Sequence, residues 1–304
     1  MIDNSKVYFH ADDYGVTKEQ SSTILSCHAQ GVLNSISIIP NTPELGACLK
    51  LLNTEDAGVQ IRRVLHLNFV EGRPAAQAEQ VGMLIDDTGY FSCSFIRLLK
   101  WNYTHRGEKR KRLKEQLKCE ITAQLKRVID DYDYQITAID SHQHYHMIPI
   151  IMEALLEVLD EKELTIQEIR IPVDPLIPLL QTPSMWLKVP VINWIKWTIL
   201  WLHAGKARRL LRQRGICVPV FFGIFFTCEM KKDVVEALLP KYREYAQKRE
   251  KNLELMFHPG NLTKQSELLD TRSKELEEFY MSDNRLAEAE CLRGISKIVE
   301  MQGY

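Results

Sequence analysis

His10-Ala11-Asp12-Asp13-Tyr14-Gly15 directly follows the apolar run Val7–Phe9. An apolar run closed by polar residues and a glycine is typical of a buried strand that ends in a tight turn, so both carboxylates are expected at the strand's carboxyl end. Adjacent carboxylates are costly because like charges raise each other's pKa. A metal ion removes that cost and gives the two acids separate roles, one as a ligand and the other as a free base. The alternative is that the pair caps a helix beginning after Thr17.

A second polar cluster, Asp140-Ser141-His142-Gln143-His144-Tyr145-His146, follows the apolar run Ile136–Ile139. Residues two apart on a strand share a face, so the three histidines would point the same way if the segment stayed extended. If the chain turns after Ser141, they cannot all be ligands of one ion. A carboxylate and three imidazoles so close together supply many metal ligands or catalytic groups, and we predict one of these roles here.

Apolar, β-rich runs alternate with segments of helical period along the whole chain, which predicts βα units and a parallel sheet. Glu108–Asp131 is the clearest helix. No glycine-rich dinucleotide loop follows the first run, which favours a barrel over a Rossmann sheet. We therefore predict a single α/β domain over residues 1–304, a (β/α) barrel of about seven parallel strands with a helical insertion near residues 180–214. The expected strands are Lys6–His10, Ser35–Ile39, Val64–Phe69, Ile136–Ile139, Ile166–Val173, Val218–Phe226 and Leu253–Phe257.

Ionisable residues lie within or directly after five of these runs. Because the carboxyl ends of parallel strands meet on one face of a barrel, these residues are expected at one rim, where such folds carry out their chemistry. A lone histidine such as His66 is usually a satisfied core residue, but its position at the same rim favours a functional role. The residues are Asp12, Asp13, His66, Asp140, His142, Arg170 and His258.

The composition bounds the function further. A formal charge of −1 gives no general attraction to nucleic acid. Seven cysteines are scattered without a Cys-x-x-Cys pair, and the first residues lack the pattern of a signal peptide, which together predict a reduced, cytoplasmic location. No run reaches the roughly 18 uncharged apolar residues of a membrane span. Val189–Ala204 comes closest, but Pro190 and Lys196 interrupt it.

These motifs together resemble the YdjC-like family, carbohydrate deacetylases that act on acetylated amino sugars such as chitooligosaccharides. That family opens with Asn-Ala-Asp-Asp-Phe-Gly, which His10–Gly15 resembles, and Asp140–His146 is nearly its histidine motif. The resemblance runs in order over most of the chain. The other matching stretches are Gly31–Ser37, His66–Phe69, Gly72–Pro74, Leu84–Phe91, Arg170–Pro172 and Leu255–Gly260.

The resemblance implies a deformed (β/α) barrel and one divalent metal ion, magnesium or zinc. Matched position by position, Asp13, His66 and His142 are the metal ligands. Asp12 is then the general base, and His258 is the general acid that protonates the departing amine. The residue types agree with amide hydrolysis, since one carboxylate and two imidazoles leave positions on the ion for water and the acetyl oxygen.

Other polar residues are expected to support this site. Arg170 should hold Asp12 ionised through a charge-assisted hydrogen bond. Asp140 should orient a histidine ring. The roles of His144 and His146 stay open.

The sequence departs from the family pattern at two places. His10 replaces the usual asparagine, so a further imidazole is expected beside the site. Val220–Ile224 is apolar where the family has a Thr-Asp-x-Phe element. If that element contacts the sugar, substrate choice differs here.

Pro175–Cys228 contains no aspartate or glutamate, although it holds seven lysines and arginines and four of the five tryptophans. Trp194, Trp197 and Trp201 share one helical face. One interpretation is a helical cap packed on the barrel with solvated cations. The other is an interfacial helix, Trp186–Arg214, that contacts anionic lipid at the inner face of a membrane. The second would suit a lipid-linked substrate, and some members of the family are associated with hopanoid lipid pathways.

Three functions stay open at this point. The first is a metal-dependent N-deacetylase of acetylated amino sugars. The second is a metal-dependent hydrolase of another amide, on a membrane-derived or lipid-linked amino sugar of hopanoid type. The third is a non-catalytic metal-binding scaffold, which would need neither the base Asp12 nor the acid His258. A homodimer is a further open question, and nucleic acid is not expected as a partner.

Overall fold

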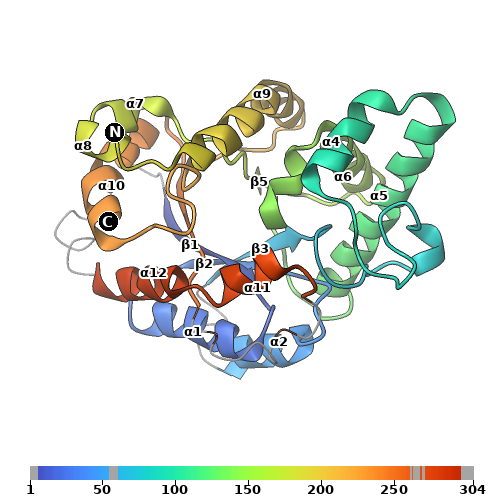
Figure 1. Ribbon diagram of the computed structural model, residues 1–304, viewed down its shortest axis with the longest axis horizontal. Helices are drawn as coiled ribbons and strands as arrows, with labels where there is room; N and C mark the ends of the chain where they lie inside the picture. Colours follow the sequence, from blue (N-terminus) through green and yellow to red (C-terminus); the bar gives the residue numbers. More distant parts are fainter. Residues whose placement is uncertain (1–5, 55–60, 261, 263–267, 269–270, 296–304) are drawn as a thin grey trace.

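A curled, fully parallel sheet forms the centre of the protein (Figure 1). The computed structural model describes residues 6–54, 61–260, 262, 268 and 271–295. Within that part of the chain the sheet has seven strands in the order β5-β4-β3-β2-β1-β7-β6. They are β1 (Val7–Tyr14), β2 (Ser35–Ile38), β3 (Arg62–Leu67), β4 (Ala138–Ser141), β5 (Glu168–Ile169), β6 (Val220–Phe222) and β7 (Leu253–Phe257). Each overlaps one of the seven predicted runs, so the prediction of a parallel α/β barrel is confirmed.

The two edges of the sheet meet only through a few contacts. Glu168 of β5 pairs with Cys217, which lies just before β6. The amide of Ile169 donates to the Cys217 carbonyl at 3.1 Å, and the Cys217 amide donates to the carbonyl of Gln167 at 2.8 Å. These edge strands are also short, with two and three residues. The barrel is therefore deformed, with a weak seam between β5 and β6.

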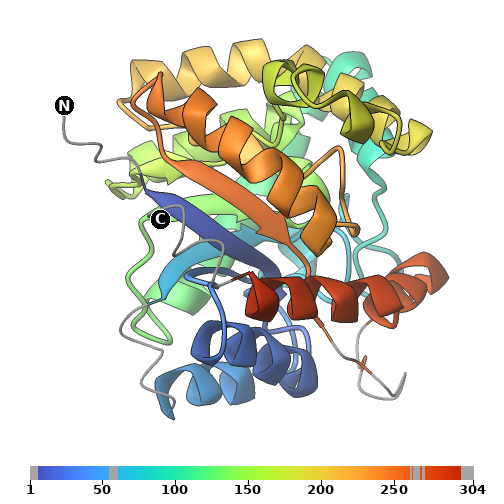
Figure 2. The ribbon, with the colours of Figure 1, turned by 90° about the vertical axis from the view of Figure 1, so that its left-hand side faces the viewer.

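Helices cover the outside of the sheet, as the two ribbon views show (Figures 1 and 2). The segment between β5 and β6 contains three helices over residues 176–213, which confirms the predicted helical insertion near 180–214. None of the described helices is long and apolar enough to cross a bilayer. The helices are α1 (Lys18–Ala29), α2 (Leu45–Thr54), α4 (Phe95–Thr104), α5 (Gly107–Ile129), α6 (Pro149–Glu161), α7 (Leu176–Leu180), α8 (Pro183–Trp186), α9 (Val191–Gln213), α10 (Lys232–Gln247), α11 (Lys274–Tyr280) and α12 (Asp283–Gly294), with short 3-10 turns at Ala78–Gln80 and His142–Met147.

Alternation along the strands separates an apolar layer from a polar barrel interior. On β2, Ile36 packs in the main apolar cluster, whereas its neighbours Ser35 and Ser37 hydrogen-bond to the buried ring of His10. The same alternation recurs on β4, where Ile139 is apolar core and Asp140 faces the interior network. Successive side chains of a strand point to opposite faces, so one sequence pattern builds both layers. The polar interior leads directly to the carboxyl ends of the strands.

Candidate active site

Asp12 and Asp13 reach the same cleft although they are neighbours on β1. In a regular strand they would point to opposite faces. The register between β1 and β2 is irregular between Ala11 and Tyr14, and Asp13 has a φ of 66°, in the left-handed region that non-glycine residues rarely adopt. Strained backbone of this kind clusters at functional sites. The helix-cap alternative is wrong, because the side chain of Thr17 caps α1.

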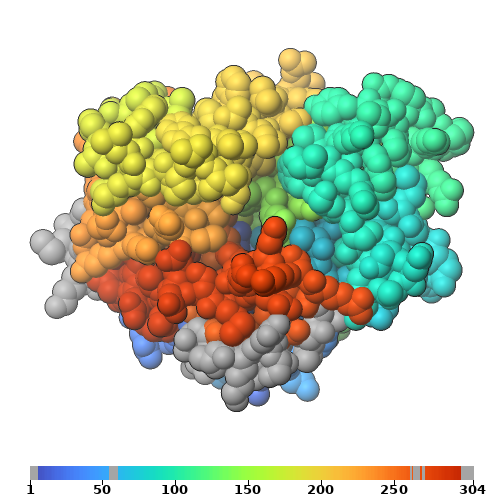
Figure 3. Space-filling view, viewed as in Figure 1, coloured from blue at the N-terminus to red at the C-terminus, as the bar shows by residue number. Residues whose placement is uncertain are grey.

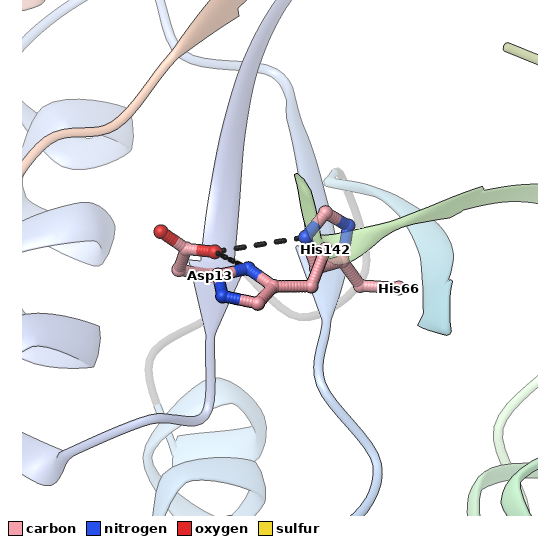
Figure 4. A group of neighbouring side chains, drawn as sticks. All are labelled: Asp13, His66 and His142. Carbon is pink, nitrogen blue, oxygen red and sulfur yellow. Dashed lines mark hydrogen bonds and ion pairs between the residues drawn. The ribbon is translucent and has the colours of Figure 1, made fainter. Parts of the chain in front are cut away.

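Asp13, His66 and His142 converge from three strand ends (Figure 4). Each offers one ligand atom within 4.8 Å of the others. Oδ1 of Asp13 lies 2.9 Å from Nδ1 of His142 and 3.6 Å from Nε2 of His66. Nε2 of both histidines is buried and hydrogen-bonds to no residue that the structure describes. Buried polar atoms normally have a partner, and one carboxylate with two imidazoles is a common divalent-metal donor set. The residues therefore fit a metal ion.

Asp140 orients the ring of His66. Its Oδ1 lies 2.6 Å from Nδ1 of His66, which leaves Nε2 directed toward Asp13. Carboxylates commonly fix metal-binding histidines in this way. Burial by itself would lower the pKa of His66, but the carboxylates of Asp140 and Asp12 outweigh it and raise that pKa to about 10. The sequence predicted that Asp140 orients a histidine ring. That ring is His66 of β3, and not a histidine of the motif that follows Asp140.

Arg170 clamps the proposed base. Its two terminal nitrogens each donate to one oxygen of Asp12, both at 2.8 Å, and both side chains are buried. Nε2 of His10 lies 3.1 Å from Asp12, and its ring also hydrogen-bonds to Ser37 at 2.7 Å. Burial would raise the pKa of Asp12, but the charges of Arg170 and His66 hold it well below its usual range. Asp12 is thus ionised and rigidly held.

The chain turns directly after β4, so the three histidines of the second cluster separate. Gln143 and His144 both adopt left-handed backbone, with φ of 48° and 61°. His146 uses both ring nitrogens in structural contacts, at 2.6 Å to the hydroxyl of Ser141 and 2.8 Å to the carbonyl of Arg170. His144 lines the cleft. The contacts of His146 therefore leave no ring nitrogen free for a ligand, whereas His144 lies where substrate can reach it.

His258 directly follows β7, which lies on the opposite side of β1 from β3 and β4, the strands that carry His66 and lead into His142. Its Nε2 lies 3.9 Å from Oδ2 of Asp12, and burial lowers its pKa to about 4. Glu288 of α12 accepts a hydrogen bond from the His258 backbone amide, and its carboxylate lies 3.9 Å from Nδ1 of that ring. Burial raises the pKa of Glu288 to about 7.

Helix α12 supplies a second charged group that sequence reasoning missed. Arg285 is almost fully buried, and its guanidinium donates to Oδ2 of Asp13 at 3.2 Å. A Cβ at Gly260 would lie 2.8 Å from the Arg285 Nε, so the glycine gives this side chain its space. Arg285 and Glu288 are the two charged residues among the buried ones of α12, and the sequence alone does not show that burial.

Two further acids were also missed. Glu71, in the loop after β3, lies 3.5 Å from Nε2 of His142 and is held by the hydroxyls of Thr271 and Tyr280. Glu254 of β7 binds Nε of Arg170 at 2.5 Å from inside the barrel. A buried charge is costly unless it is paired, and each of these carboxylates has its partner. Both acids therefore lie against predicted site residues, Glu71 beside His142 and Glu254 beside Arg170.

The predicted metal ligands, base and acid line a cleft of about 680 Å³, which opens in the face shown in Figure 3, whereas Glu71, Glu254 and Arg285 lie behind that lining. The polar part of this lining includes Asp12, Asp13, His66, His142 and His258. Much of the remaining wall is apolar. Its large apolar side chains include Phe91, Phe95, Ile96, Ile199, Leu200, Ile224 and Phe279.

A family model described as YdjC-like protein matches residues 6–295. The chain belongs to the YdjC-like family. The resemblance found from the motifs is thereby confirmed, and the match covers nearly all of the sequence.

Relatives of known name match over part of their length. A carbohydrate deacetylase of Thermoanaerobacter pseudethanolicus is 28% identical over 159 residues, 52% of this chain and 58% of that protein. A carbohydrate deacetylase of Xenopus laevis is 28% identical over 56% of this chain and 51% of its own length. A chitooligosaccharide deacetylase of Yersinia enterocolitica is 26% identical over 52% of this chain and 57% of its length. The matches thus span little more than half of these relatives.

A solved structure supports the fold over the whole chain. It is a protein from Enterococcus faecalis V583, named as a candidate cellobiose-phosphate cleavage protein, with a TM-score of 0.70 and 17% identity. The alignment covers 99% of this chain and 95% of that one. At this identity the likeness concerns the fold alone.

Proposed function

We propose that this protein is a metal-dependent hydrolase that removes the acetyl group from N-acetylated amino sugars. The observation that carries the proposal is the convergence of Asp13, His66 and His142 beside Asp12 and His258 on one cleft floor. The names of the relatives, carbohydrate deacetylase and chitooligosaccharide deacetylase, support the same reaction and substrate class.

Asp13, His66 and His142 would hold one divalent ion, magnesium or zinc. Such an ion, when bound, acidifies a water molecule and polarises the acyl oxygen of an amide. Asp140 keeps the His66 ring turned toward the ion's place, and Arg285 holds the far oxygen of Asp13. Both contacts fix ligand orientation before any ion or substrate arrives.

Asp12 and His258 would move the protons. Asp12 is ionised and can accept the proton of the attacking water. His258 has a low pKa, so it is neutral near neutral pH and must gain a proton before it can protonate the leaving amine. Asp12 lies 3.9 Å away and, with its own low pKa, releases a proton readily. The pair would therefore pass the water's proton to the amine.

A second candidate is hydrolysis of an amide on a lipid-linked or membrane-derived amino sugar. The apolar wall of the cleft favours it, because a free oligosaccharide offers little apolar surface to cover Phe95, Ile96 and Ile199. A metal-binding scaffold without catalysis is the weaker alternative, since it gives no reason to hold Asp12 and His258 so closely together.

Acetate release from a panel of N-acetylated amino sugars and glycolipids tests the proposal. The protein is first treated with a chelator and then reloaded with magnesium or zinc. We expect acetate only after reloading. Release confined to glycolipids would favour the second candidate, and no release from any substrate with either metal would contradict the proposal.

A further inference from the structure

The insertion between β5 and β6 exposes large apolar side chains to solvent. Leu187 is 88% exposed, Val191 77% and Leu202 66%. Ile192 and Ile195 are each more than half exposed. Single exposed apolar residues are common, but a concentration of them on one segment marks an interaction surface. We call this surface, on α8 and α9 together with Ile96 of α4, the apolar rim.

The tryptophans of the insertion divide between packing and exposure. Trp197 is buried, stacks on Phe225 and donates from its indole nitrogen to the Asp174 carbonyl at 2.9 Å. Trp194 also packs on Phe225. Trp201, in contrast, is 52% exposed. Trp194 and Trp197 therefore anchor α9 to the barrel, as the packed-cap interpretation expects, and the exposed surface of the insertion is mainly aliphatic, with Trp201 beside it.

The two segments that form the apolar rim are positively charged. Residues 88–107, which include α4, contain no aspartate or glutamate, and neither does Pro175–Cys228. The two segments meet where the Tyr103 hydroxyl contacts Nε2 of His203 at 2.9 Å. Two of the lysines are neutralised by acids from other elements, Lys188 by Asp233 and Lys206 by Glu153. Exposed cations of the two segments also include Arg97, Lys100, Arg106, Lys196, Arg209 and Arg212.

We propose that the apolar rim docks the protein on an anionic membrane surface. Apolar side chains that enter the headgroup region bind such surfaces by burying apolar area. Cations beside them add attraction to the anionic lipid headgroups. A second copy of the chain fits less well, because its rim would set cations against cations.

The position of the rim relative to the cleft gives docking a consequence. Ile96, Lys196 and Ile199 belong to the same two helices and also line the cleft. In Figure 3 the yellow-to-gold helices and the teal segment border the hollow on two sides. Docking by the rim would thus bring the cleft to the membrane surface, where an amphiphilic substrate lies. The docking itself does not depend on the proposed deacetylation.

Co-sedimentation of the full chain with vesicles tests the docking. Phosphatidylcholine vesicles are compared with and without phosphatidylserine, at low and high salt. We expect binding to the anionic vesicles that weakens as salt screens the cations. Leu187→Ser and Val191→Ser together should reduce the bound fraction on the order of tenfold, because both side chains are exposed and their loss removes apolar area. Tyr132→Ser, an exposed aromatic residue after α5, is the matched control and should bind normally.

Equal binding by the double variant and the control would overturn the proposal, as would no binding to anionic vesicles at low salt. Light scattering on the same proteins detects self-association. A dimer that the double variant abolishes, without vesicle binding by the parent protein, would assign the rim to a second copy instead.

Discussion

Replacing Asp12 by asparagine should remove the proposed base while keeping the shape of the site. Asparagine cannot accept a proton, so kcat for acetate release should fall. General-base catalysis contributes about 10²–10⁴-fold. The clamp by Arg170 keeps Asp12 ionised before the reaction and makes it a weak base. The expected loss is therefore near the lower end, on the order of 10²-fold, or about 2.7 kcal/mol in the activation barrier.

The substitution should spare metal binding, because Asp12 is not among the three residues proposed as ligands, Asp13, His66 and His142. One of its oxygens would become an amide nitrogen facing Arg170, which costs a charge-assisted hydrogen bond of about 1.5–3 kcal/mol in unfolding free energy. Kinetics of acetate release, calorimetric metal titration and thermal unfolding measure the three quantities separately.

Glu254→Gln is the matched control for this variant. Glu254 also binds Arg170, at 2.5 Å, but from inside the barrel and away from the cleft. Glu254→Gln should lower the unfolding free energy by a comparable amount, but it should lower kcat much less than Asp12→Asn does. If both variants lowered kcat by the same factor, Asp12 would contribute to catalysis only by holding Arg170 in place. Near-normal turnover by Asp12→Asn would remove it from the mechanism.

Three other substitutions separate ligand support from proton transfer. Asp140→Asn should weaken metal affinity by about 10–100-fold in calorimetric titration, because it loosens the His66 ring; unchanged affinity would refute its orienting role. His258→Ala should lower kcat by on the order of 10²-fold and leave metal affinity unchanged, and a variant that still turns over normally would exclude it as the acid. Gly260→Ala should lower the unfolding free energy by about 1–3 kcal/mol and weaken metal binding, because the new Cβ displaces Arg285; chemical denaturation with a normal midpoint would show that Arg285 can move without cost.

The parallel barrel and the residues at its rim could be predicted because each depends on local pattern. Alternation of apolar runs with helical segments specifies the strands, and the ends of parallel strands share one face. This argument places Asp13, His66 and His142 together without any knowledge of side-chain geometry. It also places His258 beside them.

The supporting residues could not be predicted, because their partners are distant in sequence. Arg285 reaches Asp13 across 272 positions, and Glu254 meets Arg170 across 84. No periodicity reports such a contact. The bulge at Asp13 was equally hidden, since a strand pattern does not show where the register slips. The assignment of the ring that Asp140 orients needed the pairing of β3 with β4, which sets His66 beside it.

Anomalous diffraction from a crystal loaded with zinc tests the central claim most directly. The account predicts one anomalous peak per chain, within coordination distance of Asp13, His66 and His142, with Asp12 and His258 outside the ligand set. A peak at other residues would contradict it. So would the absence of a peak at this site in crystals kept in a zinc-containing solution.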